Sequence, residues 1–466
     1  MSQNSIPHSM KSEIKETVSL SIPLVLSQLI YASSGFIGTA LIARLGEDAL
    51  AASVLVSTIW MTLIVLFFGI LNSISVLVAH QYGAKNYRAI SEIMGQSYLL
   101  GILTMIVMIL MLLAMPLLLN FSAQSVAVLK LAHQYMYALI WTVPGLVVLI
   151  INEQFLAGAN HTKLVLRISM IVVPIEIPLI YALIFGKFGL PACGVAGIGY
   201  GFAITYSITA IGLSLYLLKS KYFQKYQLFS RINQINMVYL KELIQVGLPM
   251  GFMHVVEVST FAVVTLWIGH FGTTFLAAHQ IIMQYLGFAI TLVFAVSQAV
   301  TIRVGHAVGR EDLSGVYYAS YIGMILNLMC VLIIALAFYF IPTFFLRLDI
   351  DIHNPENARL LRDASALLLI GGVLLIFDNF RIIGFGALRG LKDTRFPMYA
   401  SIISFWLIGL STAYVLSFIF HWQAAGIWWG LTIGIATGAV IVHIRLQRLL
   451  QRVDLKKLAQ IKSVAH

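Results

Sequence analysis

The chain has 466 residues and a net charge of +11, with 60% hydrophobic and only 10% charged residues, whereas a soluble domain carries about 25% charged residues. Long apolar stretches recur between short polar connections, which excludes a soluble protein and predicts an all-α polytopic membrane protein. The basic residues lie in the connections, where they set topology, so we expect no nucleic-acid partner. Cys193 and Cys330 lie in different segments and predict neither a disulfide framework nor a metal site.

Twelve apolar stretches are long enough to cross a membrane as helices. In chain order, they cover approximately residues 18–42, 50–79, 93–119, 133–156, 164–186, 194–218, 243–268, 276–300, 317–341, 362–388, 398–420 and 424–446. If the N-terminus lies in the cytoplasm, most of the 29 Lys and Arg residues fall on the cytoplasmic side. The other side then carries only Arg44, Lys130, Lys187, Arg347, Arg359 and Arg362. This asymmetry predicts a multi-pass protein of the bacterial inner (plasma) membrane with both termini cytoplasmic.

The two halves of the sequence resemble each other. Pro23 aligns with Pro249 and, at the same offset of 226 residues, "VAHQYG" (78–83) aligns with "VGHAVG" (304–309). Because each copy holds six spans, an even number, both copies enter the membrane from the same side and the repeats are parallel. We therefore predict twelve transmembrane helices in two parallel six-helix repeats around a central cavity.

The repeat also predicts a domain organisation. The stretch that begins "KSKYFQKYQLFS" is basic and aromatic, a composition typical of a cytoplasmic connector at the membrane interface. The predicted parts are an N-terminal six-helix lobe (1–218), a cytoplasmic linker (219–241), a C-terminal six-helix lobe (242–448) and a cytoplasmic tail (449–466).

Two acidic residues in the second repeat are the first candidates for a functional site. Glu257 and Asp378 lie within spans seven and ten, where an unpaired charge is costly, and they can face each other if these spans pack. Two carboxylates in a dry site cannot both ionise without a cation or proton between them. They predict a switchable site for monovalent Na⁺ or H⁺ or, alternatively, a structural pair satisfied by neighbouring polar groups.

Polar residues near this pair can support it. His254 lies three residues before Glu257, on the same helix face, and can share its proton or fill the helix interface. Arg381 lies three residues after Asp378 and either pairs with it or points toward the cytoplasmic mouth; both alternatives stay open. Span eight adds three residues that can offer neutral oxygens or form interhelical hydrogen bonds: Gln280, Gln284 and Tyr285.

Three stretches are specific enough to suggest a family: "LAAHQI" (276–281), "TIRVGHAVG" (301–309) and "GALRGLKDTRFP" (386–397). With them, the chain resembles the multidrug and toxic compound extrusion (MATE) family, in its NorM-like branch, over essentially its whole length. The resemblance implies cation-coupled export of organic cations by alternating access. It also implies that Glu257 and Asp378 form a cation site in the C-terminal half.

Two positions depart from the family pattern. Gly38, in "GFIGT", stands where the family usually has an acid in span one, and Arg381 stands where a neutral residue is expected. Glu176, in a proline-flanked stretch, either replaces the missing acid as a proton site of the N-terminal lobe or faces a water-filled vestibule without a proton role. We expect Glu153, near a helix end, to be structural. The acid pair favours Na⁺ as the coupling ion, whereas the two departures favour H⁺, so the ion stays open.

Three functions compete. A secondary antiporter that exports amphipathic organic cations and drugs against Na⁺ or H⁺ fits the acid pair. The alternative, a lipid-linked precursor flippase of related architecture, would need several arginines within the spans, and only Arg381 qualifies. A membrane enzyme would need a catalytic constellation at a membrane face, and none is visible, so we expect neither an enzyme nor a cofactor. "GIGYG" (197–201) lies inside a span, where small residues serve helix packing, so we expect no ATP; we also expect a monomer in the lipid bilayer.

Overall fold

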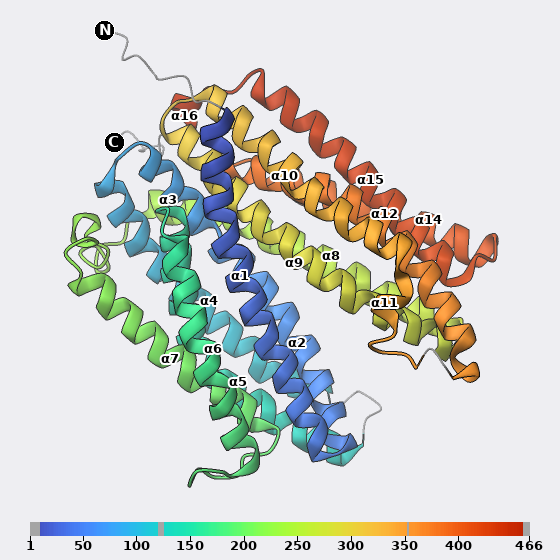
Figure 1. The fold of residues 1–466 in the computed structure, drawn as a ribbon. Helices are drawn as coiled ribbons and strands as arrows, with labels where there is room; N and C mark the ends of the chain where they lie inside the picture. Colours follow the sequence, from blue (N-terminus) through green and yellow to red (C-terminus); the bar gives the residue numbers. More distant parts are fainter. Residues whose placement is uncertain (1–9, 120–124, 352–353, 460–466) are drawn as a thin grey trace. The chain divides into compact units, whose positions relative to one another are not determined.

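The computed structural model describes residues 10–119, 125–351 and 354–459. Within these residues, twelve helical segments are long and apolar enough to cross a membrane (Figure 1). This finding confirms the all-helical, twelve-span prediction, and every predicted span overlaps one of the segments. Most segments extend several residues beyond the predicted spans because their polar end turns remain helical.

The bounds of the helices follow. The α-helices are α1 (Met10–Ile42), α2 (Glu47–Leu71), α3 (Ser73–Gly83), α4 (Tyr87–Leu119), α5 (Val126–Gly158), α6 (Thr162–Phe185), α7 (Ala196–Lys219), α8 (Met237–His270), α9 (Thr273–Gly309), α10 (Leu313–Phe340), α11 (Pro342–Leu346), α12 (Ala358–Gly390), α13 (Arg395–Ser401), α14 (Ser411–Tyr414), α15 (Gln423–Leu450) and α16 (Leu455–Ala459). The 3-10 helices are η1 (Ala43–Leu45), η2 (Gln224–Tyr226) and η3 (Pro355–Asn357). Two further elements, η4 (Ile402–Leu410) and η5 (Val415–Ile419), are π-helices.

The eleventh span is not the regular α-helix that its sequence predicts. It alternates α13, η4, α14 and η5, so π-helical winding covers much of its length. Glycines of α15 allow a close approach to it: a Cβ atom on Gly430 would overlap the backbone of Ala413, and one on Gly434 would overlap the carbonyl oxygen of Ser404. The wider π-turns, which often occur at functional sites, place Phe405 of η4 beside the buried charges described below.

The chain forms two compact units. The C-terminal unit contains the described residues of Met1–Val25 and Phe252–Leu458, and the N-terminal unit contains Leu26–Gly251 and Ala459. The boundaries fall inside α1 and α8, so each of these helices contributes to both units. The lobe boundaries at residues 218 and 242 follow the sequence repeat instead and stay a prediction.

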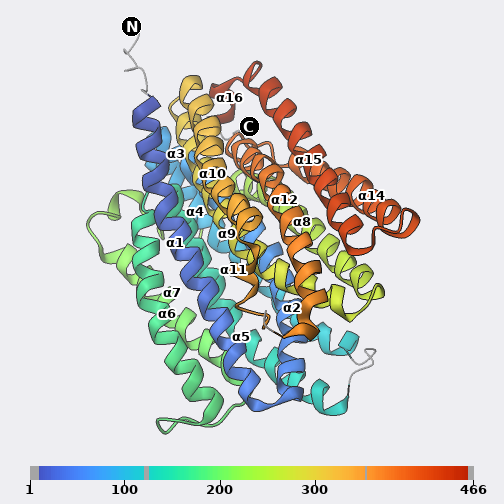
Figure 2. The ribbon, with the colours of Figure 1, turned by 45° about the vertical axis from the view of Figure 1, so that its right-hand side comes forward.

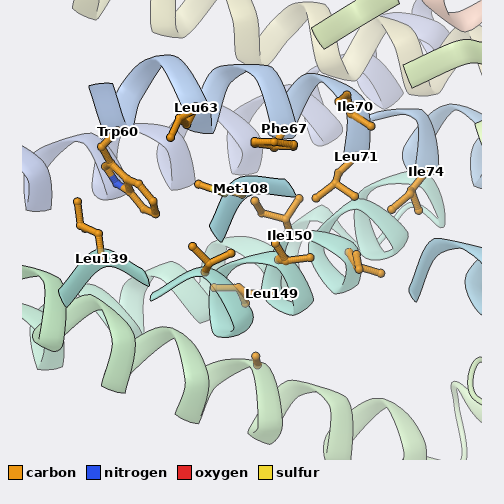
Figure 3. Close-up of a cluster of buried hydrophobic side chains, with 14 of the residues drawn as sticks. Trp60, Leu63, Phe67, Ile70, Leu71, Ile74, Met108, Leu139, Leu149 and Ile150 are labelled. Carbon is orange, nitrogen blue, oxygen red and sulfur yellow. The ribbon is translucent and has the colours of Figure 1, made fainter. Parts of the chain in front are cut away.

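In the N-terminal unit, α5 packs against α2, α3, α4, α6 and α7. Figure 3 shows part of this core, with Trp60 and Phe67 of α2 beside Leu139 and Ile150 of α5, and with Met108 of α4 nearby; all five are buried. Helices in a membrane associate through close packing and interhelical hydrogen bonds rather than through exclusion of water. This interdigitated core therefore holds the unit together.

In the C-terminal unit, α12 packs against α9, α10 and α15 (Figure 2). Every residue of α12 from Arg381 to Gly390 is buried, so this last part of the helix has no face left for lipid. Charged side chains on it must find their partners inside the protein.

The predicted linker packs against the N-terminal unit. The Ser91 hydroxyl donates to the carbonyl oxygen of Gln227 at 2.8 Å, and the Gln96 amide nitrogen donates to that of Gln234 at 2.6 Å. Because both donors lie on α4, these bonds hold the linker against this helix.

Candidate cation site

Four of the predicted site residues come together on two helices. His254 and Glu257 lie one turn apart on α8, and Asp378 and Arg381 lie one turn apart on α12. All four are buried, with exposures of 7% for Glu257, 3% for Asp378 and 2% for Arg381. In this position, each charge depends on the other three side chains, because little water reaches them.

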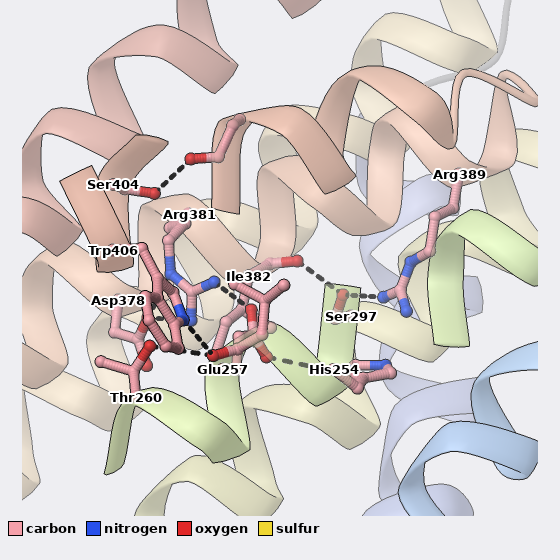
Figure 4. Close-up of polar contacts among 12 residues, drawn as sticks. His254, Glu257, Thr260, Ser297, Asp378, Arg381, Ile382, Arg389, Ser404 and Trp406 are labelled. Atoms are coloured by element: carbon pink, nitrogen blue, oxygen red, sulfur yellow. Dashed lines mark hydrogen bonds and ion pairs between the residues drawn. The ribbon is translucent and has the colours of Figure 1, made fainter. Parts of the chain in front are cut away.

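Arg381 bonds to both carboxylates. Its Nε and Nη2 atoms donate to Oδ1 of Asp378 at 2.7 and 2.6 Å, and its Nη1 atom donates to Oε1 of Glu257. Figure 4 shows the guanidinium between the two acids. The sequence left two orientations open for this side chain, and the structure places it on the acids.

His254 contacts the other oxygen of Glu257. Its Nδ1 atom lies 3.4 Å from Oε2, while its ring meets the ring of Phe294 edge-on. Glu257 therefore has the guanidinium on one carboxylate oxygen and the imidazole on the other. Whether this imidazole–carboxylate pair carries an added proton decides the net charge of the cluster.

Aromatic rings surround the guanidinium. Its Cζ atom lies 4.7 Å from the centre of the Phe405 ring and 5.3 Å from that of Phe385, distances at which ring faces attract a cation. A Cβ atom on Gly438 of α15 would lie 3.2 Å from Cδ of Arg381, so the glycine leaves room for the arginine side chain. The pocket that holds this cation is thus built from α8, α12, η4 and α15.

The three span-eight candidates do not reach the site. Gln280 and Gln284 are exposed on α9, and within the described residues no hydrogen bond joins either of them to Glu257 or Asp378. Tyr285 bonds instead to the carbonyl oxygen of Phe345, at 2.8 Å, and to the carboxylate of Asp349. The reason is helical phase, since the buried face of α9 runs through Ala278, Ile282 and Leu286.

In the N-terminal unit, Glu176 of α6 is fully buried. It accepts hydrogen bonds from the hydroxyl of Ser34 on α1 and from that of Thr205 on α7, the latter at 3.2 Å. Gly38 follows Ser34 by one turn of α1. The carboxylate of Glu176 therefore contacts the same stretch of α1 in which the expected acid is missing.

Glu153 of α5, like Glu176, is bound by a hydroxyl group of α1. The Tyr31 hydroxyl of α1 donates to its carboxylate at 2.9 Å. The sequence singled out neither Tyr31 nor the hydroxyl partners of Glu176, because serine, threonine and tyrosine are frequent in these spans and only the fold brings particular ones to an acid. Their signal, a hydroxyl at helical spacing from position 38, is weak.

Arg389 is a further buried arginine on α12 that the sequence did not single out. Its Nη2 atom donates to the Ser297 hydroxyl at 2.7 Å, and that hydroxyl donates to the carbonyl oxygen of Ile382 (Figure 4). Its Nε atom has no hydrogen-bond partner among the described residues. Unlike Arg381, Arg389 thus has a neutral hydrogen-bond partner and no ion pair with either acid. Within the described part of the chain, no group of three or more His, Cys, Asp or Glu residues could hold a metal ion.

Comparison with known proteins decides the family. The MatE family model matches the chain twice, over residues 23–182 and 249–415. The chain belongs to the MatE family. The two matches start at residues 23 and 249, and 249 minus 23 is 226, the offset of the sequence repeat. The duplication and the family resemblance are both confirmed.

NorM proteins are among the relatives of this MatE chain. It is 31% identical to the multidrug resistance protein NorM of Burkholderia vietnamiensis, over 94% of each chain, and 30% identical to a probable NorM of Pseudomonas aeruginosa, over 92% of this chain and 88% of that one. Its fold is similar to that of the Vibrio cholerae MATE transporter VcmN in the bent form, with a TM-score of 0.85 and 16% identity over 95% and 98% of the two chains. It is also similar to that of the eukaryotic MATE transporter AtDTX14, with a TM-score of 0.80 and 19% identity over 97% and 98%.

Proposed function

We propose that this protein is a secondary antiporter that exports amphipathic organic cations and drugs by alternating access, driven by inward movement of Na⁺ or H⁺. Its family and the multidrug resistance names of its relatives support export. One observation supports cation coupling: Glu257, Asp378 and Arg381 form a buried cluster of two acids and one base.

The cluster lacks one positive charge. With both acids ionised and His254 neutral, its net charge is −1. An uncompensated charge in a buried site costs several kcal/mol, so the cluster favours any state that adds one positive charge. A proton, a monovalent metal ion or a cationic drug can each supply it.

This deficit couples the two movements. A ligand shifts a conformational equilibrium only by its difference in affinity between the two states. If the coupling ion and the drug neutralise the same cluster, binding of one releases the other, and the two bind in turn on opposite sides. A membrane potential of 100 mV adds roughly 2.3 kcal/mol for each charge that moves through it, which is enough to bias the exchange.

Glu176 is the second site of the proposal. We assign it as a proton site of the N-terminal lobe that replaces the acid missing at position 38. Its contact with Ser34, one turn from Gly38, supports this assignment. A hydroxyl both donates and accepts, so the partners of Glu176 suit the carboxylate and the carboxylic acid alike.

Two further parts of the proposal follow from charge. The excess of basic residues in the predicted cytoplasmic connections supports an inner-membrane protein with both termini in the cytoplasm. A flippase would need several free arginines, but Arg381 is bound to two acids and the buried Arg303 to Glu13 and Glu16. Of the three arginines buried in the described part of the chain, Arg389 alone has only a neutral hydrogen-bond partner. No observation favours an enzyme.

The test is drug efflux from proteoliposomes. Glu257→Gln and Asp378→Asn each remove one negative charge and bring the cluster to neutrality, so each should abolish gradient-driven export while the protein remains folded. The double variant should export little less than either single variant, because both side chains serve one site and the loss of either already disables it. Glu356→Gln, which removes an exposed carboxylate of the same unit, is the control and should export normally. Export by Glu257→Gln at the wild-type rate would refute the proposed site.

A further inference from the structure

The guanidinium of Arg381 lies where a coupling cation would be expected to bind, between two carboxylates of different helices. We infer that it is a tethered cation that takes the place of Na⁺ there, so that the Glu257–Asp378 site exchanges protons and organic cations but not Na⁺. The inference rests on the proposed antiport and identifies its coupling ion.

The carboxylate oxygens are already in use. Arg381 bonds to Oδ1 of Asp378 and to Oε1 of Glu257, and His254 contacts Oε2 of Glu257. Among the described residues, only Oδ2 of Asp378 has no such partner. Hard metal cations bind through several oxygen ligands at once, roughly six to eight for Ca²⁺. With the other three oxygens bound to Arg381 or in contact with His254, the pair offers a metal ion few of the ligands it needs, whereas the free oxygen can still accept a proton.

The guanidinium is held in place. Its planar fork matches a carboxylate better than a round ion does, and the rings of Phe405 and Phe385 lie at 4.7 and 5.3 Å from Cζ. Since Arg381 is part of α12, it cannot diffuse away from the two acids as a free ion can. A Na⁺ ion would have to displace this group and then tolerate its repulsion.

With both acids ionised and His254 neutral, the cluster keeps one negative charge, which one proton would neutralise. The ionisable groups that contact the guanidinium or its partners are Glu257 and His254 from α8 and Asp378 from α12. Arg389 is the next charge on α12, two turns further along. The other contacts are uncharged: Phe294 of α9, Phe385 of α12, Phe405 of η4 and Gly438 of α15. A single proton on the imidazole or on the free oxygen of Asp378 therefore neutralises the cluster.

Sodium binding can be measured without transport. We compare the melting temperature of purified protein in NaCl and in choline chloride. Any rise in NaCl that remains in the Asp378→Asn variant does not come from this site and is subtracted. We expect no net rise for the wild type. Arg381→Ala exposes two carboxylates without a base, and Na⁺ should then raise the melting temperature by a few °C, about what ligand binding well above Kd gives. Arg389→Ala, which removes a buried arginine that is bound to neither acid, is the matched control and should gain no Na⁺ response.

Transport then separates this inference from the proposed function. In proteoliposomes, a pH gradient should drive drug export by the wild type, and a Na⁺ gradient at equal pH should not. Export driven by Na⁺, or a Na⁺ response of the wild type that Asp378→Asn removes, overturns the tethered cation and leaves the antiport intact. If neither gradient drives export, the proposed function fails, and the melting experiment still decides the role of Arg381. Should Arg381→Ala not fold, Arg381→Lys, which loses the planar fork but keeps the charge, must stay insensitive to Na⁺, and a Na⁺ response from it counts against the inference.

Discussion

A third buried arginine, Arg303, allows a sharp stability prediction. In the C-terminal unit, Arg303 of α9 donates to Glu13 of α1 from Nε at 2.8 Å and from Nη2 at 2.6 Å, and its Nη1 atom pairs with Glu16. The two acids differ mainly in burial. The side chain of Glu13 is 1% exposed, that of Glu16 is 41% exposed and that of Arg303 is 3% exposed. One guanidinium thus binds a buried and a solvated partner of the same chemistry.

The magnitudes follow from burial. Arg303→Gln removes the guanidinium that binds the buried Glu13 carboxylate, and breaking a buried pair in this way should cost about 3–5 kcal/mol. Glu13→Gln leaves Arg303 with Glu16 as its partner and loses charge-assisted hydrogen bonds, at about 1.5–3 kcal/mol. Glu16→Gln removes a solvated partner and should cost at most about 1 kcal/mol. The predicted order of destabilisation is therefore Arg303, then Glu13, then Glu16.

The assay is thermal unfolding of purified variants in one detergent, followed by loss of the monodisperse chromatographic peak. A double variant, Glu13→Gln with Arg303→Gln, removes both buried charges and should be at least as stable as Arg303→Gln alone, because the coupled pair is not additive. Equal melting temperatures for Glu13→Gln and Glu16→Gln would refute the link between burial and cost. An Arg303→Gln variant with the same melting temperature as the wild type would also refute this link.

Four further outcomes are expected. Glu176→Gln should impair drug export while the protein still reaches the membrane, and unchanged export would make Glu176 structural. A cysteine at Lys225, with both native cysteines replaced by serine, should react with an impermeant maleimide only from the cytoplasmic side; labelling of intact cells would overturn the predicted topology. Gly430→Ala should cost about 1–3 kcal/mol through overpacking, whereas Gly212→Ala, with open space at its Cβ position, should be neutral or stabilising by thermal unfolding. Burial and, less strongly, the ammonium of Lys225 lower the pKa of His161 to about 4, so stability should be full above pH 6.5 and fall as the pH drops toward 4; His161→Phe should flatten that pH profile.

Much of the fold could be predicted from the sequence because the bilayer restricts it. A spanning segment must be long, apolar and helical, so length and hydropathy predict twelve helices without knowledge of their neighbours. The repeat is also visible in the sequence, because Pro23 and Pro249 stand at equivalent places and begin the two family matches. The π-helical winding of the eleventh span was not predictable, because length and hydropathy predict a helix without specifying how tightly it winds.

The site could be predicted only in part. Charges inside spans are rare enough that Glu257 and Asp378 were visible as candidates in the sequence. The orientation of Arg381 was not, because a spacing of three residues allows both pairing with Asp378 and a turn toward the helix end. The support expected from Gln280 and Gln284 stays a prediction: both are exposed on α9, away from the face of that helix that packs inward.

The donors around the buried acids differ between the two units, and this difference has a chemical consequence. A guanidinium only donates hydrogen bonds, so the oxygens of Glu257 and Asp378 that face Arg381 must stay deprotonated. The hydroxyls of Ser34 and Thr205 can donate to Glu176 when it is ionised and accept from it when it is protonated. A proton at Glu176 therefore needs only rotation of two hydroxyls, whereas a proton in the C-terminal cluster must go to the His254–Glu257 Oε2 contact or to the free oxygen of Asp378. At Glu176 the neighbouring hydroxyls can rotate to suit either protonation state, whereas in the C-terminal cluster the guanidinium of Arg381 restricts where a proton can bind.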